Sequence, residues 1–443
     1  MYKQNRLMTT LLKTIPEIEQ ASTAEIKTFQ NKKLVELLQY LNTNSSFYQR
    51  KFQTDKIDIS KIKTIEDLQE ITLTTKDDLQ QYNDDFICVE RNKIIDYVTT
   101  SGTLGKPVTF ALTDADLDRL AYNEAISFAC ARVTKNDVVQ LMTTMDRRFM
   151  AGLAYFLGIR KLGAGMIRVG AGIPELQWDS ILKFKPTYLI AVPSFLLKLI
   201  QYAEANGIDY NASSVKGVIC IGESLRKEDF SLNTLSKKIT DKWDVKLYST
   251  YASTEMGTAF TECEHLQGGH HHPELIITEI VDDNGVVVQD GEEGELVITT
   301  LGFEALPLLR FKTGDVVKAH YDTCGCGRNT MRLGPVVGRK KQMVKYKGTT
   351  IYPPAMHDLL NHFDEVDCYI IEISTNDIGT DEILIKIASE DTSAKFLTKI
   401  KDHFRAKLRV APVIEFHDAK EINKLRFPKM SRKPVDFIDK RMS

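Results

Sequence analysis

The stretch from Asp96 to Pro107, DYVTTSGTLGKP, marks the point where the pattern of the chain changes. A short β-rich run leads into a glycine loop, and a long helical pattern follows from Thr113 to Arg132. Farther on, compact apolar runs at Asp137–Met142 and Thr187–Val192 are typical of buried strands. Strands that alternate with helices predict an α/β domain with a largely parallel sheet, whose sites lie beyond the carboxyl ends of the strands.

The sequence as a whole predicts two domains. Residues 1–338 form the large domain, with a helical start at 1–90 and a β-rich part at about 260–336. In the helical start, the periodic apolar pattern from Leu34 to Phe52 predicts a helix. Residues 339–443 form a small α+β domain, with a hairpin that turns at Lys347–Gly348.

Composition sets limits on function. The 443 residues carry 58 Lys and Arg against 60 Asp and Glu, a net charge of −2, which argues against a nucleic-acid binder that relies on bulk charge. No stretch approaches the roughly 18 apolar residues of a membrane span, and the first residues show no signal-peptide pattern. Seven sparse cysteines favour a reducing compartment over a disulfide scaffold. We therefore expect a soluble cytoplasmic protein.

The glycine loop from Thr99 to Lys106 has the chemistry of a phosphate site. Glycines let backbone N–H groups approach phosphate oxygens, hydroxyls add donors, and Lys106 adds positive charge. The pattern does not have Walker A spacing, because Pro107 follows the lysine where Ser or Thr is required. An ordinary strand-to-helix turn is the alternative for this loop taken alone.

The loop resembles the T-S-G-T-x-G-K-P signature of the acyl-adenylate-forming superfamily, which includes acyl-CoA synthetases, adenylation domains and luciferases. Further motifs follow in the superfamily's order: Tyr251–Glu255 resembles Y-G-x-T-E, Thr313–Asp315 resembles T-G-D, and Gly338–Arg339 resembles the G-R before the hinge. Lys433 falls at the C-terminal lysine.

Within the superfamily, the chain is most similar to the phenylacetate–CoA ligase family. That family has PLIRYRTGD where this chain has Pro307–Asp315, and V-I-D-x-R where this chain has Phe437–Arg441. It also has a Cys-Glu-His and a Cys-x-Cys-Gly-Arg element, matched by Cys263–His265 and Cys324–Arg328. The departures are Ala252 in place of glycine, and Arg432 and Pro434 beside Lys433 where Gly and Ala are usual.

The resemblance implies a role for each matched residue. The phosphate loop would be Thr99, Thr100, Ser101, Gly102, Thr103, Gly105 and Lys106. The nucleotide would also contact Gly222, Glu223, Ser224, Tyr251, Ala252, Ser253 and Thr254, with Asp315 and Arg339 at the ribose. Glu255 would hold Mg²⁺, and Lys433 would be the catalytic lysine between the carboxylate and the α-phosphate.

The implied reaction has two steps. A carboxylic acid, aryl and phenylacetate-like by family resemblance, attacks ATP to give an acyl-adenylate, and the thiol of coenzyme A then takes the acyl group. Between the steps, residues 339–443 would turn as a lid about Arg339–Lys341 and bring the hairpin Met343–Tyr352 to the pantetheine. Alternatives are a different acceptor, such as a carrier protein or another cofactor, and a regulatory nucleotide binder that has lost catalysis. A homodimer is possible.

Three cysteines and a histidine form a candidate metal site. Cys263, His265, Cys324 and Cys326 supply a closed set of thiols and imidazole suited to structural, tetrahedral zinc. The alternative is a group of unpaired reduced thiols in loops. We expect the internal run His270–His272 to be a polar loop that faces solvent or the substrate, although it could also supply a metal ligand.

Overall fold

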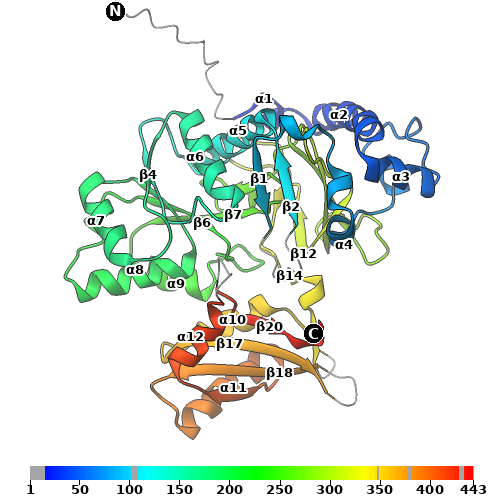
Figure 1. The fold of residues 1–443 in the computed structure, drawn as a ribbon. Helices are drawn as coiled ribbons and strands as arrows, with labels where there is room; N and C mark the ends of the chain where they lie inside the picture. Colours follow the sequence, from blue (N-terminus) through cyan, green and yellow to red (C-terminus); the bar gives the residue numbers. More distant parts are fainter. Residues whose placement is uncertain (1–14, 101–107, 347–348, 377–380, 429–433, 443) are drawn as a thin grey trace, which may run out of the picture. The chain divides into compact units, whose positions relative to one another are not determined.

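The computed structural model describes residues 15–100, 108–346, 349–376, 381–428 and 434–442 (Figure 1). Contacts divide the chain into two compact units. Unit 1 comprises residues 1–231, 239–313 and 317–335, and unit 2 comprises 232–238, 314–316 and 336–443. The predicted boundary between residues 338 and 339 stays a prediction.

The α-helices, with short 3-10 segments between some of them, have the following bounds: α1 Glu17–Gln20, α2 Thr23–Asn44, α3 Ser46–Thr54, α4 Lys76–Gln81, α5 Asp114–Cys130, α6 Met150–Leu162, α7 Pro174–Phe184, α8 Pro193–Ala205, α9 Thr234–Thr240, α10 Pro353–Leu360, α11 Ala394–Leu408 and α12 Ala419–Arg426.

The strands are β1 Asp96–Thr99, β2 Thr109–Leu112, β3 Val138–Leu141, β4 Gly165–Arg168, β5 Tyr188–Ala191, β6 Gly217–Ile221, β7 Lys246–Ala252, β8 Ala259–Glu262, β9 Gly269–His270, β10 Ile276–Val281, β11 Glu293–Thr300, β12 Phe311–His320, β13 Arg332–Leu333, β14 Gly338–Arg339, β15 Val344–Tyr346, β16 Thr349–Ile351, β17 Val366–Thr375, β18 Asp381–Ser389, β19 Val413–Phe416 and β20 Phe437–Asp439.

The helical start differs from the sequence prediction at Ser45. The pattern from Leu34 to Phe52 is divided between α2 and α3, because Ser45 has an extended backbone and its hydroxyl accepts the N–H of Tyr48. A serine in this position ends one helix and caps the next. The apolar residues of this periodic pattern are nevertheless buried on both helices, among them Leu34, Leu41 and Phe52.

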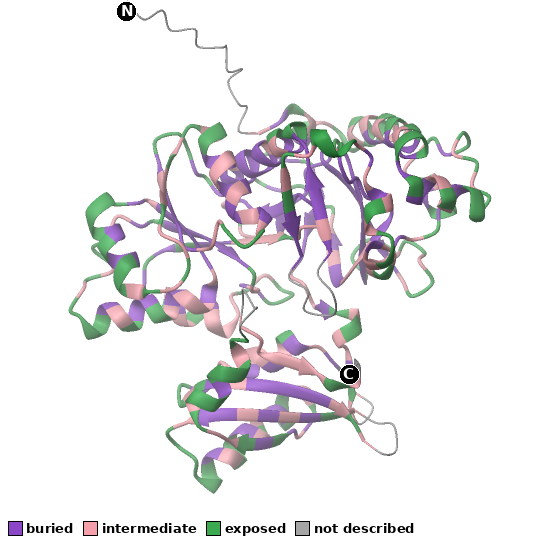
Figure 2. Cartoon of the chain, in the orientation of Figure 1, coloured by how far each residue is buried: buried purple, intermediate pink, exposed green. Residues whose placement is uncertain are grey.

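The large sheet has a parallel half and an antiparallel half. Its order is β10-β11-β12-β13-β9-β8-β7-β6-β5-β3-β4, with β14 paired to β12, and β4, β3, β5, β6 and β7 are parallel neighbours. Every residue of β5 and β6 is buried, as central strands of an α/β sheet require. The α/β class predicted from the sequence is confirmed, and the strands appear as buried ribbons in Figure 2.

Helices cover both faces of the parallel strands (Figure 1). Val139 and Leu141 of β3 pack with Phe128 of α5 and Tyr155 of α6. Gln140, between them, points to the opposite face and donates to the side-chain oxygen of Gln177 on α7 at 2.9 Å. The alternation along β3 therefore separates two helical layers.

Unit 2 is built on a four-stranded sheet in the order β19-β18-β17-β20. Alternate residues of β17 and β18 face α10 and α11 on one side, among them Ile371 and Ile385 with Phe404. The other side carries Cys368 and Ile370 against Ile422 of α12. α10 begins at Pro353, because proline is favoured at the first position of a helix.

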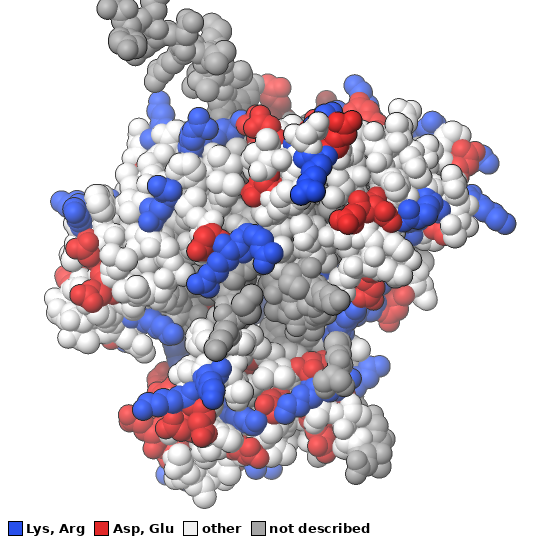
Figure 3. Space-filling view, viewed as in Figure 1, with Lys and Arg blue, Asp and Glu red and all other residues white. Residues whose placement is uncertain are grey.

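Charges are mixed over the surface. On the face shown in Figure 3, Lys and Arg side chains alternate with Asp and Glu side chains on each unit. No helix in the described part of the chain combines the length and the apolar character that crossing a membrane demands.

A buried carboxyl at the α5–α6 interface generates a pH-dependent prediction. Glu124 lies where Gly158 allows α6 to approach closely, and its carboxylate accepts from the side chain of Asn123 at 3.1 Å. Within the described residues no cation pairs with it, and burial raises the pKa of Glu124 to about 8. The folded protein thus holds this proton up to pH 8, whereas the unfolded chain releases it near 4.5.

Stability contributed by Glu124 is therefore lost as the pH rises from about 4.5 to about 8, by up to about 1.4 kcal/mol per pH unit. We expect Glu124→Gln to remove this decline in stability. The unfolding free energy of the variant, relative to that of the unsubstituted protein, should therefore increase as the pH rises from about 4.5 to about 8. Urea denaturation at several pH values measures it, with Glu175→Gln on the exposed face of α7 as the matched control. Equal slopes for Glu124→Gln and the unsubstituted protein would contradict it.

Candidate functional site

Two of the predicted nucleotide-binding segments lie side by side. β6 and β7 are parallel neighbours, and Ile221 is in register with Thr250. Gly222 and Tyr251, the next residues, therefore meet at the carboxyl edge of the sheet. Gly222 has a φ of +79°, a left-handed conformation that glycine adopts without strain and that turns the chain away from β6.

The next two residues of this segment are held by hydrogen bonds. The carboxylate of Glu223 accepts the backbone N–H of Ser194 at 2.9 Å and its hydroxyl at 2.7 Å, which satisfies the first turn of α8. The hydroxyl of Ser224 donates to the carbonyl of Arg226 at 3.1 Å. The Glu223 carboxylate thus joins the loop after β6 to the first turn of α8.

Only the first two residues of the phosphate loop are within the described structure. Thr99, the last residue of β1, donates its N–H to the carbonyl of Arg148, in the segment that follows β3, at 3.0 Å. Thr100 forms a pair of 3.0 Å bonds with Val108, from its N–H to the carbonyl and from its hydroxyl oxygen to the N–H. Both threonines are buried. Ser101, Gly102, Thr103, Gly105 and Lys106 lie outside the described residues.

Ala252 is the last residue of β7, and Ser253, Thr254 and Glu255 begin the turn between β7 and β8. The hydroxyl of Ser253 accepts the N–H of Met256 at 3.2 Å, and its carbonyl accepts the N–H of Gly257 at 3.2 Å. Thr254 and Glu255 in this turn are partly exposed. A carboxylate on a fixed, partly exposed turn is accessible to a hard cation.

The two predicted ribose residues also meet. Asp315 on β12 is in backbone register with Arg339 on β14, and the guanidinium Nε lies 3.2 Å from the carboxylate. Both residues belong to unit 2. Lys433, the predicted catalytic lysine, lies outside the described residues, as does its neighbour Arg432.

A second site is formed by sulfur and imidazole. The ligand atoms of Cys263, His270, Cys324 and Cys326 lie within 4.8 Å of one another. The sulfurs of Cys263 and Cys324 are 3.5 Å apart, and the sulfur of Cys326 is 3.4 Å from Nε2 of His270. Zinc bonds of about 2.0 to 2.3 Å in a tetrahedron separate neighbouring ligand atoms by about 3.3 to 3.8 Å, so the spacing fits a Cys₃His zinc site.

The structure differs from the sequence prediction at the histidine. His265 is not in the group; its ring lies against Gly325, in the turn between the other two cysteines. His270 takes the place instead, because β8 and β9 pair antiparallel and put Glu262 opposite Gly269. The expectation of a polar loop at His270–His272 is wrong as well, since all three histidines are buried.

Further bonds orient this cluster. Nδ1 of His270 lies 3.2 Å from the hydroxyl of Thr330, which leaves Nε2 directed at the sulfurs. The Cys326 sulfur accepts from the Arg328 guanidinium at 3.6 Å, and hydrogen bonds from Cys263 and His270 lower the pKa of Cys326 to about 2. These contacts favour the deprotonated form of Cys326, which is the form in which a cysteine binds a metal.

The same arginine reaches the start of the chain. Nε of Arg328 donates to Glu19 at 2.6 Å, and the other oxygen of Glu19 is 2.5 Å from Nδ1 of His272. Asn329 donates its N–H to the carbonyl of Glu19 at 2.8 Å, and its side chain donates to Gln20 at 3.0 Å. The sequence carried no signal for Glu19, because it lies 309 positions from Arg328.

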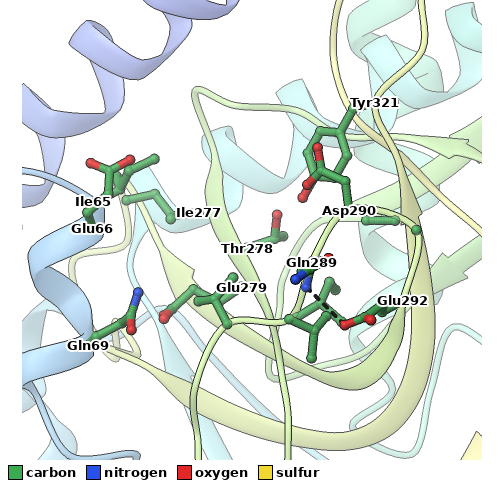
Figure 4. Close-up of a pocket in the computed structure, with 15 residues that line it drawn as sticks. Ile65, Glu66, Gln69, Ile277, Thr278, Glu279, Gln289, Asp290, Glu292 and Tyr321 are labelled. Atoms are coloured by element: carbon green, nitrogen blue, oxygen red, sulfur yellow. Dashed lines mark hydrogen bonds between the residues drawn. The ribbon is translucent and has the colours of Figure 1, made fainter.

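A cavity of about 240 Å³ lies elsewhere, in the antiparallel half of the sheet. Figure 4 shows its acidic lining, with Glu66 and Glu279 on one side and Asp290 and Glu292 on the other. Arg310 neutralises Glu279 through bonds of 2.8 to 3.1 Å. None of the described residues predicted to bind the nucleotide or the metal lines this cavity.

An open parallel sheet with polar turns converging at its carboxyl edge defines an α/β protein that binds a small ligand at that edge. The family model of AMP-binding enzymes matches residues 30–302. The chain belongs to this family.

Curated relatives are similar over most of their length. The chain is 29% identical over 356 residues to phenylacetate-coenzyme A ligase of Thermus thermophilus, covering 79% of this chain and 78% of the relative. It is 27% identical over 388 residues to phenylacetate-coenzyme A ligase of Escherichia coli, covering 85% of each. A crystal structure of 2-hydroxyisobutyryl-CoA ligase with 2-HIB-AMP has the same fold, with a TM-score of 0.83, 23% identity, and 96% and 92% coverage.

Thr100 provides a test of how the base of the phosphate loop is built. Its hydroxyl oxygen is the acceptor for a buried N–H, so Thr100→Val leaves that N–H without a partner at a cost of about 1 to 3 kcal/mol. Thr100→Ser keeps the acceptor, and we expect it to lose less than half as much. Urea unfolding of both variants measures the difference. Equal losses would contradict this, because they would show that the methyl group contributes as much to stability as the hydroxyl.

Proposed function

We propose that the protein is an AMP-forming acid–thiol ligase, which activates a carboxylic acid with ATP and transfers the acyl group to coenzyme A. The observation that carries the proposal is the meeting of Gly222–Ser224 with Tyr251–Glu255 at one sheet edge, in a chain of the AMP-binding family. The two relatives named phenylacetate-coenzyme A ligase support the reaction type and favour an aryl acid of the phenylacetate kind.

In this proposal the residues of the chain bring the carboxylate and ATP together, both of which are anions, and neutralise their charge. Thr99 to Lys106 would bind the β- and γ-phosphates, and the segment Gly222–Ser224 with Tyr251 would flank the adenine. Asp315 would accept hydrogen bonds from the ribose hydroxyls and Arg339 would donate to the sugar. When bound, Mg²⁺ supplies charge neutralisation at the phosphates, and Glu255 is the residue that would hold it.

Residues 339–443 would act as a lid. Lys433 would contact the attacking carboxylate and the α-phosphate in the first step and leave before the second. The hairpin Met343–Tyr352, of which β15 and β16 are described, would then line the path of the pantetheine. Closure keeps water from the mixed anhydride.

Lys433→Ala is the test of the first step. We expect carboxylate-dependent ATP–pyrophosphate exchange to fall by about 10²- to 10³-fold, since a positive charge that meets the developing charge is lost. Thioester formation from a supplied acyl-adenylate should change little, because the lysine acts only in the first step. Screening aryl, indolyl and short aliphatic acids in the same assay identifies the acid.

Lys424→Ala, on the exposed face of α12, is the matched control and should retain full exchange. Undiminished exchange in Lys433→Ala would overturn the assigned mechanism. Product analysis with and without coenzyme A decides the acceptor: adenylate that accumulates in the presence of the thiol would favour a carrier protein or another cofactor.

We further propose that Cys263, His270, Cys324 and Cys326 hold a structural zinc ion. Four protein ligands leave no position for substrate, and the metal would fix the turn Cys324–Arg328. That turn continues into Arg328 and Asn329, which bind residues 19–21 through the bonds described above. Zinc would therefore fasten the end of α1, just before α2, to the antiparallel half of the sheet.

Removal of the metal should make the N-terminal part of α2 accessible to proteases. Protein purified without added metal should contain about one zinc per chain, and chelation should open tryptic cleavage at Lys27, Lys32 or Lys33. Glu19→Gln should open the same sites while zinc is retained, whereas Cys324→Ser should lose both. Elemental analysis and limited proteolysis with mass spectrometry measure the two effects.

Cys368→Ser, a buried thiol of unit 2, is the matched control and should change neither zinc content nor cleavage. A complete absence of zinc from the purified protein would refute the site.

We propose a cytoplasmic location. Its support is the use of ATP and coenzyme A and the seven cysteines, all described, none of which forms a disulfide. Association into a homodimer stays a prediction that light scattering would test.

A further inference from the structure

A buried ion pair joins the two segments that are predicted to bind the nucleotide, Gly222–Ser224 and Tyr251–Glu255, through the residues that follow them. Nε of Arg226 donates to Oε1 of Glu262 at 2.6 Å, and the two side chains are only 6% and 1% exposed. Arg226 follows the segment Gly222–Ser224, and Glu262 is the last residue of β8. The pair therefore joins the loop after β6 to the hairpin made by β7 and β8.

Each partner has a second bond to β7. Oε2 of Glu262 accepts the N–H of Ser249 at 2.9 Å, just before the β7–β8 ladder begins at Thr250. Nη2 of Arg226 donates to the carbonyl of Leu247 at 3.3 Å. Ser249 lies two residues before Tyr251, so the carboxylate fixes the strand that carries one wall of the predicted adenine site.

The arginine also fixes the other wall. Its carbonyl accepts the hydroxyl of Ser224 at 3.1 Å, and its Nη1 donates to the carbonyl of Phe230 at 3.2 Å. Phe230 has a φ of +64°, which closes the loop on itself. One ion pair thus sets the separation of the segment Gly222–Ser224 from Tyr251.

A hydrophobic pair of similar volume could stabilise such a position equally well, because burying two charges costs several kcal/mol. What an apolar pair cannot supply is the set of directed bonds to Ser249, Leu247 and Phe230. We propose that Arg226 and Glu262 are positioning residues for the nucleotide base: they hold the two walls at the spacing of an adenine ring. The inference rests on the proposed function, in that it takes these walls to bind the base of ATP.

The test compares ligands that do and do not carry a base. For the full chain with its metal, calorimetry measures the affinities of AMP, GMP and inorganic pyrophosphate. We expect Glu262→Gln and Arg226→Lys to weaken AMP about tenfold and to narrow the preference for AMP over GMP, with pyrophosphate changed less than about twofold. In ATP–pyrophosphate exchange, the KM for ATP should rise while kcat stays within about threefold.

The double variant Arg226→Met/Glu262→Leu separates positioning from stability. Its unfolding free energy should return toward that of the unsubstituted protein, whereas its AMP affinity should stay reduced. Should that variant fail to fold, the conservative Glu262→Gln and Arg226→Lys still give the comparison. Zinc content is measured in each variant, because Glu262 precedes Cys263.

Glu279→Gln is the matched control. Glu279 is a comparably buried partner of Arg310 at 2.8 Å, and its loss should cost stability without changing the affinity for AMP. Unchanged AMP affinity in both pair variants, or an equal loss in Glu279→Gln, would overturn the inference. If the unsubstituted chain binds no AMP at all, the proposed function fails with it; if it binds AMP and the variants bind equally well, only the positioning role fails.

Discussion

The reversal of chain direction between β7 and β8 is the constraint on which both sites depend. In the large sheet, β3 to β7 are parallel and their carboxyl ends share one edge, and from β8 the sheet continues antiparallel. The turn Ser253–Thr258 therefore lies at the ligand-binding edge, and the end of β8 carries Glu262 and Cys263 to the far end of the hairpin. A single hairpin thus links the carboxyl edge of the parallel strands to the cluster of Cys263, His270, Cys324 and Cys326.

Buried arginines connect the antiparallel half of the sheet to its surroundings, which the net charge of −2 does not reveal. Arg119 donates to the carbonyls of Leu301, Gly257 and Leu275, with bonds of 2.6 to 2.7 Å. The Leu275 carbonyl also accepts the N–H of Leu301 at 2.8 Å, so the Arg119 guanidinium adds bonds from α5 to backbone carbonyls of three segments that are far apart in sequence. Arg226 and Arg310 likewise donate to backbone carbonyls and also to a carboxylate, whereas Arg328 donates to the carboxylate of Glu19 and the sulfur of Cys326. Each of these buried arginines joins segments that are far apart in sequence.

Local patterns predicted the elements but not the long-range partners. The strand runs at β3 and β5 and the helix after Thr113 were predicted correctly, because burial, periodicity and a capping box are encoded within a few residues. The histidine beside the sulfurs was expected to be His265, because Cys263-x-His265 is the closer spacing in sequence, and only the β8–β9 register brings His270 to the sulfurs. The burial of His272 depends on Glu19 and Ser127, which no local pattern connects to it.

The residues predicted to bind the base and those predicted to bind the ribose are held in place by interactions of different strength. The walls at Gly222–Ser224 and Tyr251 are fixed by buried charges and by backbone register, so their spacing is costly to change. The Asp315–Arg339 pair is a different case, since the Arg339 side chain is 47% exposed and its Nε lies 3.2 Å from the carboxylate. Such a pair contributes only about 0 to 1 kcal/mol. Little free energy therefore holds Arg339 to Asp315, whereas the buried bonds of Arg226 and Glu262 make the positions of the loop after β6 and of β7 costly to change.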